Sequence, residues 1–242
     1  MQHKPLILAL LAGLSLSGAA QATLFDRGGG LIYDTGLNVT WLQNANLAAY
    51  NHFSVSGIAA NGTMNWNTAN QWIGAMNTAD YLGYSDWRLP TTAPINGSAF
   101  NNSYGYNGTT DFSYNISAPG TAHAGSTASE MAYLFYNDLG NKAYYDTSGN
   151  LQAGYGVTHV GPFQNLQSHP YWSGTEYAPG SNYAWHFGTG SGMQGAVTEN
   201  IHYYAWAVRP GDVVAAVPEA DTWVMLLAGL GLMGVVARRR RG

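Results

Sequence analysis

The sequence of 242 residues contains no cysteine. This absence excludes a disulfide framework, thiolate metal ligands and a cysteine nucleophile. Charge is also scarce, because Asp, Glu, Lys and Arg make up only 9% of the chain and 13 acidic residues outnumber 9 basic ones. So little positive charge disfavours a nucleic-acid partner, since neutralisation of phosphates dominates such binding. The sequence is rich instead in aromatic residues and glycine, with 17 Tyr, 8 Trp and 31 Gly, and its length suits one packed domain with processing segments.

The first 22 residues have the organisation of a secretory signal peptide. Lys4 supplies a positive charge, an apolar run follows it, and Ala20 and Ala22 are the small residues of a cleavage site. The apolar run is shorter than the roughly 20 residues that a membrane-spanning helix needs. We therefore predict cleavage after Ala22 and export, with a buried N-terminal helix as the alternative.

Residues 214–242 combine three features in a fixed order. Pro218 and Glu219 come first, an apolar stretch over 223–237 follows, and a run of arginines ends the chain. The arginines are Arg238, Arg239, Arg240 and Arg241. A helix over the apolar stretch would be about 22 Å long, short of the roughly 30 Å core of a bilayer, but it can hold where flanking side chains snorkel and the bilayer thins. The arginines would stay cytoplasmic, which places the preceding chain on the far side of the inner membrane.

This order of features resembles the PEP-CTERM protein-sorting signal. The resemblance implies an inner-membrane-anchored precursor that an exosortase cleaves near the motif and releases to the cell exterior. The sequence departs from the family at Ala220, where the motif carries its second proline. A plain membrane anchor at the tail is the alternative.

Removal of both ends leaves an acidic chain that is rich in amides. Between residues 23 and 217, four basic and eleven acidic residues give a net charge of −7. Such a charge favours solubility and disfavours polyanions such as sulfated glycans. Neutral sugars remain suitable ligands, because aromatic faces and amides such as those of the 20 Asn residues fit sugar rings.

Turn signals and short apolar runs predict strands on both sides of a helical middle. Two short strands around a glycine-containing turn fit residues 31–42. Further strands are expected around residues 171–173, 184–187 and 203–209. In the last of these, side chains are expected to alternate between two faces.

Two helices are expected between these strands. Apolar residues at helical spacing predict a helix at about 67–79. Thr127 and Glu130 have the spacing of a capping box, which predicts a second helix that Gly140 ends. Strand, helix, helix and further short antiparallel strands are typical of an α+β fold, which we predict as a single domain over 23–213.

A polar insertion at about 91–125 separates the two expected helices. Irregular stretches of this length in a compact domain are usually functional or disordered. Its tyrosines, Tyr104, Tyr106 and Tyr114, are the candidates for a surface that contacts a sugar. The alternative is a tolerated insertion that packs over the core.

Five segments of the middle carry a second resemblance, which covers about residues 27–213. They are Thr40-Trp41-Leu42, the stretch Gly83 to Thr91, Glu130 to Gly140, Tyr171 to Glu176, and Ala205 to Pro210. In this order they resemble the Lcl C-terminal domain family. The resemblance implies a C-type-lectin-like domain and carries no catalytic residue with it. The Trp-Arg-Leu-Pro-Thr stretch is also similar to sulfatase modifiers of the formylglycine-generating type, whose chemistry needs thiols that this chain lacks.

Two of the four basic residues of the middle, Arg88 and Arg209, stand in aromatic segments. We predict that they form structural ion pairs with Asp86, Glu130 or Glu176. Removal of either partner of such a pair, if it is buried, would leave a costly unpaired charge. The functional alternative is a pair of catalytic carboxylates across a cleft, for which Asp86 and Glu176 are the candidates.

The histidines show no spacing typical of a metal site, and we predict no metal and no cofactor. A pair on neighbouring strands, His186 with His202, is the alternative. Calcium stays open, because it is compatible with the lectin-like fold that the resemblance implies.

These features predict an exported, exosortase-processed protein that is a non-catalytic component of the cell surface or extracellular matrix. Exopolysaccharide is the ligand we expect. An enzyme that acts on envelope glycans and a purely structural biofilm protein are the alternatives.

Overall fold

The computed structural model describes residues 24–213. The expected signal peptide with Ala20 and Ala22, and the sorting segment from Pro218 onward with its apolar stretch 223–237, lie outside the described residues. Within the part that is described, no helix is both long enough and apolar enough to cross a membrane.

The described chain combines short helices with short strands. In chain order these are β1 (Leu24–Gly28), β2 (Leu31–Asp34), β3 (Val39–Leu42), the 3-10 helix η1 (Leu47–Ala49), α1 (Trp66–Thr78), the 3-10 turn η2 (Tyr81–Gly83), β4 (Tyr104–Gly105), β5 (Phe112–Ser113), α2 (Glu130–Tyr133), the π-helix η3 (Leu134–Asp138), β6 (Pro170–Glu176), β7 (Tyr183–Gly188), β8 (Met193–Thr198) and β9 (Val208–Pro210).

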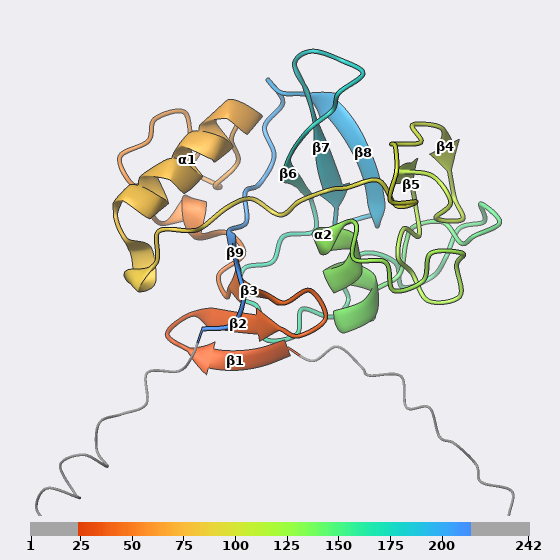
Figure 1. The fold of residues 1–242 in the computed structure, drawn as a ribbon, viewed down its shortest axis with the longest axis horizontal. Helices are drawn as coiled ribbons and strands as arrows, with labels where there is room; N and C mark the ends of the chain where they lie inside the picture. The colour runs from red at the N-terminus through yellow and green to blue at the C-terminus, as the bar shows by residue number, and fades with distance from the viewer. Residues whose placement is uncertain (1–23, 214–242) are drawn as a thin grey trace, which may run out of the picture.

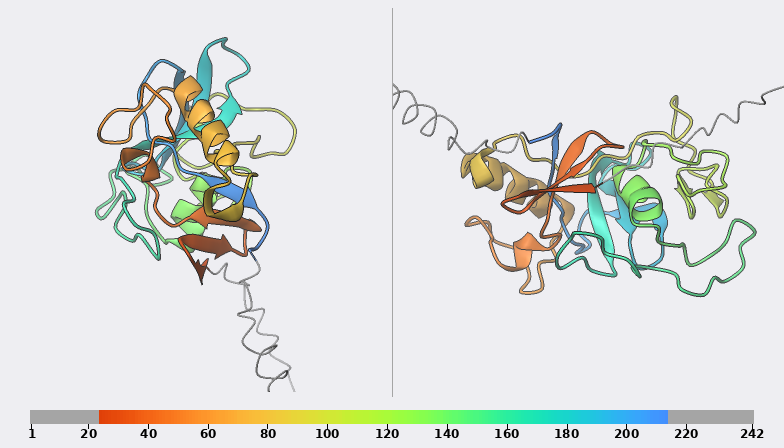
Figure 2. Two further views of the ribbon diagram at one scale, coloured as in Figure 1. Left: turned by 90° about the vertical axis from the view of Figure 1, so that its left-hand side faces the viewer. Right: turned by 90° about the horizontal axis from the view of Figure 1, so that it is seen from below.

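The strands form two antiparallel sheets at opposite ends of the molecule (Figure 1). One sheet has the order β1-β2-β3-β9, and the other has the order β6-β7-β8, while β4 and β5 form a two-residue parallel pair at one side. In the view from below, α1 and α2 lie on opposite sides of the first hairpin, and the loop-rich part of the chain lies beyond α2 (Figure 2). The architecture is therefore mixed α+β, as predicted.

The first sheet joins the two ends of the described chain. Its hairpin turn is closed by the Asp34 carboxylate, whose Oδ1 accepts hydrogen bonds from the backbone N–H groups of Gly36 and Leu37 at 2.9 and 3.0 Å. β9 pairs with β3, so the last strand completes the sheet that the first strands begin. An ion pair between Arg27 and Asp212, 2.6 Å long, ties the two ends together.

α1 forms where the apolar spacing predicted it, and it begins one residue earlier. The Asn65 side chain caps it by accepting a hydrogen bond from the Thr68 N–H at 2.8 Å. Its inward face is almost fully buried and includes Trp72 and Met76. Burial of such large side chains contributes about 1.5–3 kcal/mol each to folding, which fixes α1 on the core.

The second helix is capped differently from the prediction. It begins at Glu130, and the cap is Ser129, whose hydroxyl accepts a hydrogen bond from the Ala132 N–H at 3.4 Å, so Thr127 is not the cap. The capping box does not form because the Glu130 carboxylate bonds to Arg88 and to the Thr91 N–H instead. The helix then continues as the π-helix η3, which ends before Gly140. Gly140 has a φ of +64°, a conformation that suits glycine.

The segment 203–209 runs through the core between the two sheets. Every residue from Tyr204 to Val208 is buried, so both faces of the segment are covered. The segment bonds to one sheet through the Trp172 N–H and the Tyr204 carbonyl, and to the other through the Leu42 N–H and the Ala207 carbonyl. Only the last part of the segment is a regular strand, β9, because its backbone hydrogen-bonds first to one sheet and then to the other. Strands β1 and β8 were not predicted from the sequence.

The insertion at 91–125 packs on the core with little regular structure. Its centre is Asp111, which is fully buried and accepts hydrogen bonds from the backbone N–H groups of Ile95 and Asn101, both at 2.7 Å. A buried carboxylate that is satisfied by backbone donors can hold an irregular loop in one conformation. The insertion is therefore an ordered platform for the tyrosines that it carries.

Candidate functional site

Tyrosine rings from the insertion and from residues 144–155 pack into one continuous group. We call it the tyrosine cluster, and its members are Tyr104, Tyr106, Tyr114, Tyr144, Tyr145 and Tyr155. Successive ring centroids lie 4.5 to 5.9 Å apart, and most pairs are edge to face. Edge-to-face pairs contribute about 0.5–1.5 kcal/mol each beyond the area they bury, so the rings hold one another in place.

The exposed rings differ from the predicted ones. Tyr104 is 52% exposed and Tyr155 is 45% exposed, whereas Tyr114 is only 8% exposed. Tyr114 does not face solvent, contrary to the prediction, because its backbone pairs with Met193 and its ring stacks on Tyr106. Tyr106 is half-buried. Tyr104 and Tyr155 are therefore the most exposed rings of the cluster, and the other rings pack against them.

Asn115 joins the two stretches of chain that carry the cluster. Its Nδ2 donates to the carbonyl of Tyr106 at 2.7 Å and to the carbonyl of Tyr145 at 2.9 Å. Asn115 has a φ of +58°, in the left-handed region that asparagine tolerates better than most residues. The sequence showed a turn-forming residue here, but nothing in it indicated that this amide would bridge to a stretch thirty residues later.

The chemistry of the cluster suits a neutral ligand. Partial burial of its hydroxyl, together with hydrogen bonds to Tyr106 and Tyr114, raises the pKa of Tyr104, so the hydroxyl is uncharged at neutral pH and can donate or accept a hydrogen bond. Exposed ring faces provide apolar contact, and uncharged hydroxyls provide hydrogen bonds at their edges. Leu151, which is also exposed, adds apolar surface near the same stretch of chain.

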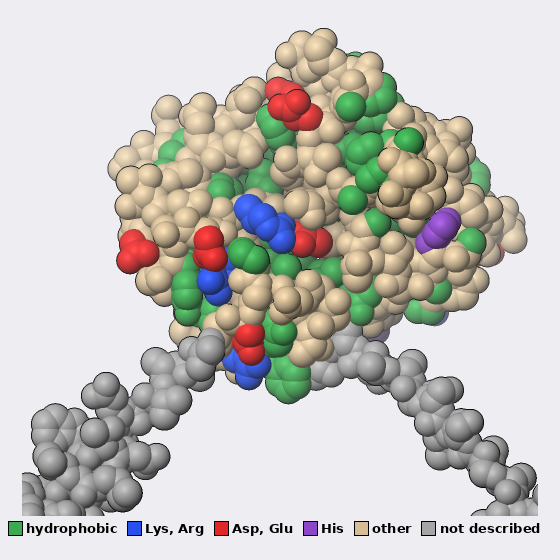
Figure 3. Space-filling view, in the orientation of Figure 1, with side chains coloured by type: hydrophobic (Ala, Val, Ile, Leu, Met, Phe, Trp, Pro, Cys, Tyr) green, Lys and Arg blue, Asp and Glu red, His purple; other side chains and the backbone are tan. Residues whose placement is uncertain are grey.

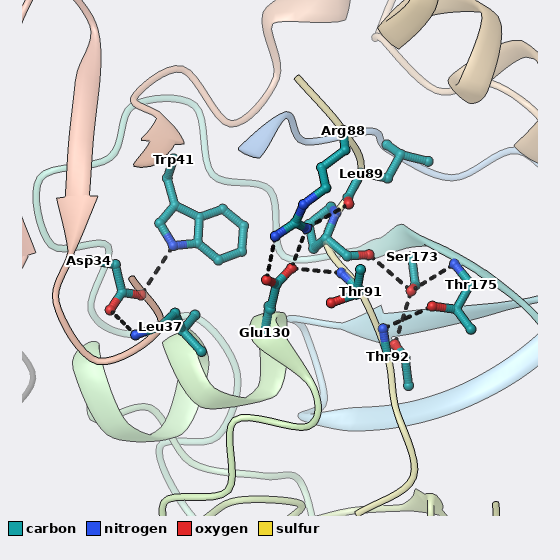
Figure 4. A network of polar contacts seen from close by, with 11 residues as sticks. Asp34, Leu37, Trp41, Arg88, Leu89, Thr91, Thr92, Glu130, Ser173 and Thr175 are labelled. Atoms are coloured by element: carbon teal, nitrogen blue, oxygen red, sulfur yellow. Dashed lines mark hydrogen bonds and ion pairs between the residues drawn. The ribbon is translucent and has the colours of Figure 1, made fainter. Parts of the chain in front are cut away.

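Arg88 and Glu130 form a two-pronged ion pair (Figure 4). Arg88 Nη1 and Nη2 donate to the two carboxylate oxygens of Glu130, each at 2.7 Å, and the Thr91 N–H donates to the same carboxylate at 2.7 Å. Glu130 is buried at the start of α2, and its oxygens are occupied by protein donors. The pair holds the Trp-Arg-Leu-Pro-Thr stretch against α2, and both Glu130 oxygens accept from protein donors.

A second set of contacts joins the same stretch to β6 (Figure 4). The Thr92 hydroxyl donates to Ser173 Oγ, and Ser173 Oγ donates to the Pro90 carbonyl, both at 3.0 Å. The Thr92 N–H donates to Thr175 Oγ1 at 3.0 Å. The Trp-Arg-Leu-Pro-Thr stretch therefore links α2 with the β6 sheet.

Arg209 pairs with Asp86 at the molecular surface. Arg209 Nε and Nη2 donate to the Asp86 carboxylate at 2.8 and 2.9 Å, and the guanidinium carbon lies 4.0 Å above the ring of Tyr84. Glu176 is exposed at the end of β6 and takes part in no ion pair among residues 24–213. Asp86 and Glu176, the candidate catalytic pair, are therefore in different settings, and Asp86 is held by an arginine.

The candidate histidine pair is divided between the core and the surface. His186 packs against the ring of Tyr203 with centroids 5.0 Å apart, and burial lowers its pKa to about 4. His202 is exposed. Within the described part of the chain, no three His, Cys, Asp or Glu side chains gather in a group that could hold a metal ion.

One pair of carboxyl groups was not anticipated from the sequence. Asp34 is fully buried, and the carboxyl of Asp138 at the end of η3 lies close enough to interact with it. Burial first, and then the charge of Asp34, raises the pKa of Asp138 to about 8, so the two carboxyls share a proton at neutral pH. The Asp34 oxygens already accept from the turn N–H groups and from Trp41 Nε1 at 3.2 Å, which makes the pair part of the scaffold.

Comparison with known families now identifies the chain. The Lcl C-terminal domain family matches residues 30–209, and the PEP-CTERM protein-sorting motif matches residues 216–241. The sorting motif defines the class: an exported protein that an exosortase processes from a membrane-anchored precursor. Within that class, the chain belongs to the Lcl C-terminal domain family. No curated protein and no solved structure matches it.

Proposed function

We propose that this protein is a non-catalytic component of the cell surface or extracellular matrix that binds exopolysaccharide through the tyrosine cluster. The observation that carries the proposal is the pair of exposed rings, Tyr104 and Tyr155, on a rigid base of packed tyrosines. Rigid aromatic faces lose little conformational entropy when a ligand stacks on them.

The charge of the molecule supports a neutral polysaccharide. Basic side chains are few, and on the face shown in Figure 3 each blue group lies beside a red one within a largely uncharged surface. Three arginines, Arg27, Arg88 and Arg209, are each occupied by a carboxylate. Little positive charge remains for a sulfated or phosphorylated glycan.

A C-type-lectin-like fold is part of the same proposal. It is supported by the α+β architecture, in which the first and last strands share one sheet, and by the long ordered loops that leave the other sheet. The resemblance of the sequence segments to families of that fold points the same way.

The setting of the acidic residues supports a non-catalytic role. Glycoside hydrolysis uses two carboxyls on opposite sides of the scissile bond, about 5–10 Å apart. Asp86, Glu130 and Asp212 are paired with arginines. Asp34 is fully buried and accepts hydrogen bonds from the turn N–H groups and from Trp41, so it does not face a cleft.

The proposal is tested by retention of the exported protein on exopolysaccharide purified from the producing cells. We expect the wild type to be retained and Tyr104→Ala to bind about tenfold more weakly, because it removes the most exposed ring of the cluster. The matched control is Tyr50→Ala, which removes a tyrosine that is 71% exposed and lies outside the cluster.

Equal retention of both variants would show that the cluster is not the binding surface. Absence of retention of the wild type, together with weaker cohesion of the matrix in cells that lack the protein, would favour a purely structural role.

A further inference from the structure

A polar hollow lies where α1 begins and β8 ends. It has a volume of about 400 Å³, and every residue that lines it has a polar side chain: Asn65, Asn67, Asn182, Thr198, Glu199 and Asn200. We infer that this amide hollow, as we call it, is a separate subsite for the hydroxyl groups of a neutral sugar, and the inference rests on the proposed function.

Backbone hydrogen bonds hold the three segments of the amide hollow together. The Trp66 N–H donates to the Glu199 carbonyl at 3.0 Å, and the Glu199 N–H donates to the Asn182 carbonyl at 2.9 Å. Asn182 has a φ of +68°, a left-handed conformation that turns the chain into β7. The hollow is therefore shaped before any ligand arrives, which lowers the entropic cost of binding.

The side chains of the hollow keep free hydrogen-bonding capacity. Asn65 Oδ1 caps α1, and Asn67 Nδ2 donates to Glu199 Oε2 at 3.1 Å. Among residues 24–213, the side-chain amides of Asn182 and Asn200 have no partner. Glu199 forms no ion pair within the same part of the chain.

This set of groups fits a polyol better than an ion. Sugar hydroxyls both donate and accept, and amides together with a carboxylate offer both kinds of partner. The Glu199 carboxylate opposes anions. A calcium ion takes six to eight oxygen ligands and usually several carboxylates, whereas this hollow has one carboxylate.

The amide hollow and the tyrosine cluster lie at opposite ends of β8. Tyr114 pairs with Met193 at the start of the strand, and Thr198 and Glu199 stand at its end. At about 3.4 Å per residue these points are roughly 17 Å apart. A monosaccharide would therefore occupy one site alone, whereas a polysaccharide can engage both and gain avidity.

The test uses the exported protein with 15N-labelled side chains and methyl glycosides of glucose, galactose and mannose as probes. We expect at least one glycoside to shift the side-chain amide signals of Asn67, Asn182 and Asn200 in a saturable way. Asn182→Gly keeps the left-handed backbone and removes the amide, and Glu199→Gln removes the carboxylate. Each is expected to weaken this binding about fivefold, the effect of one lost hydrogen bond.

The matched control is Asn165→Gly, which removes another exposed left-handed asparagine outside the hollow and should leave the binding unchanged.

If no glycoside shifts these signals while exopolysaccharide is still retained through Tyr104, the amide hollow is not a sugar subsite and the proposed function stands. If glycosides bind the hollow but Tyr104→Ala leaves polysaccharide retention unchanged, the sugar subsite in the hollow is supported and binding through the tyrosine cluster is not. Shifts with calcium chloride alone, and loss of the glycoside shifts in EDTA, would assign the hollow to a cation and overturn the inference.

Discussion

Asp138 is the residue whose protonation most affects this fold near neutral pH. Its carboxyl lies against the buried Asp34, and its pKa is raised to about 8, whereas an unfolded aspartate titrates near 3.9. The folded state therefore binds the proton more tightly than the unfolded state, so the free energy of unfolding falls as pH rises through the folded pKa. We expect a decrease of about 1–2 kcal/mol between pH 6.5 and pH 9, after allowance for partial solvent screening.

Asp138→Asn is expected to remove most of this pH dependence, because an amide can still donate a hydrogen bond to Asp34 but does not titrate. Urea unfolding at the two pH values measures the difference. The pH range starts at 6.5 to limit the contribution of His186. Burial lowers the pKa of His186 to about 4, so its effect on the free energy of unfolding lies mostly below its unfolded pKa. An unchanged slope in the variant would mean that another group carries the proton.

At the scale of elements, the Arg88–Glu130 pair fastens α2 to the stretch that precedes the insertion. Glu130→Gln leaves Arg88 without a carboxylate in a partly buried position, and we expect it to lower the free energy of unfolding by about 2–3 kcal/mol. Asp212→Asn is the control, because it breaks the more exposed Arg27 pair and should cost less than about 1 kcal/mol. Equal losses in urea unfolding would show that burial does not distinguish the two pairs.

Local signals in the sequence predicted the elements whose causes are local. The apolar spacing places α1 to within a residue of its observed bounds. The cap of α2 was misplaced because Glu130 bonds to Arg88, which lies 42 positions away and whose partner no capping rule indicates. The regular strand expected over 203–209 is limited to its last part, β9, for a similar reason, since the segment bonds to two sheets that pairing over long distances creates.

The candidate site could be predicted only in part, because some of its contacts join distant stretches of the chain. The tyrosines of the insertion suggested a ligand surface, and Tyr104 is exposed as expected. The contribution of Tyr155 depends on the bridge that Asn115 makes to residue 145, a contact between distant stretches with no signature in either. The amide hollow likewise assembles from three separate segments, and nothing in any one of them indicates that the others lie beside it.

At the scale of the whole molecule, the attachment point and the candidate ligand surfaces are separated. The described chain ends at Val213, next to β9 in the first sheet, while the end of β8 with the amide hollow lies in the second sheet at the other end (Figure 1). A precursor held in the membrane by the segment after Val213 would therefore keep its first sheet towards the anchor. The second sheet would already be accessible to polysaccharide before release.

Processing of that segment gives the last prediction. Mass spectrometry of protein from the culture medium should find a chain that begins at Thr23 and ends near Pro218, without the arginine cluster. Glu219→Ala should keep the full-length precursor in the membrane fraction, because the acidic residue of the sorting motif is lost. Asp221→Ala, a nearby acidic residue that follows Pro218-Glu219-Ala220, is the control and should be released like the wild type. Release of both variants with an intact C-terminus would contradict exosortase processing at this motif, and retention of both would mean that charge in the segment, rather than the motif, directs release.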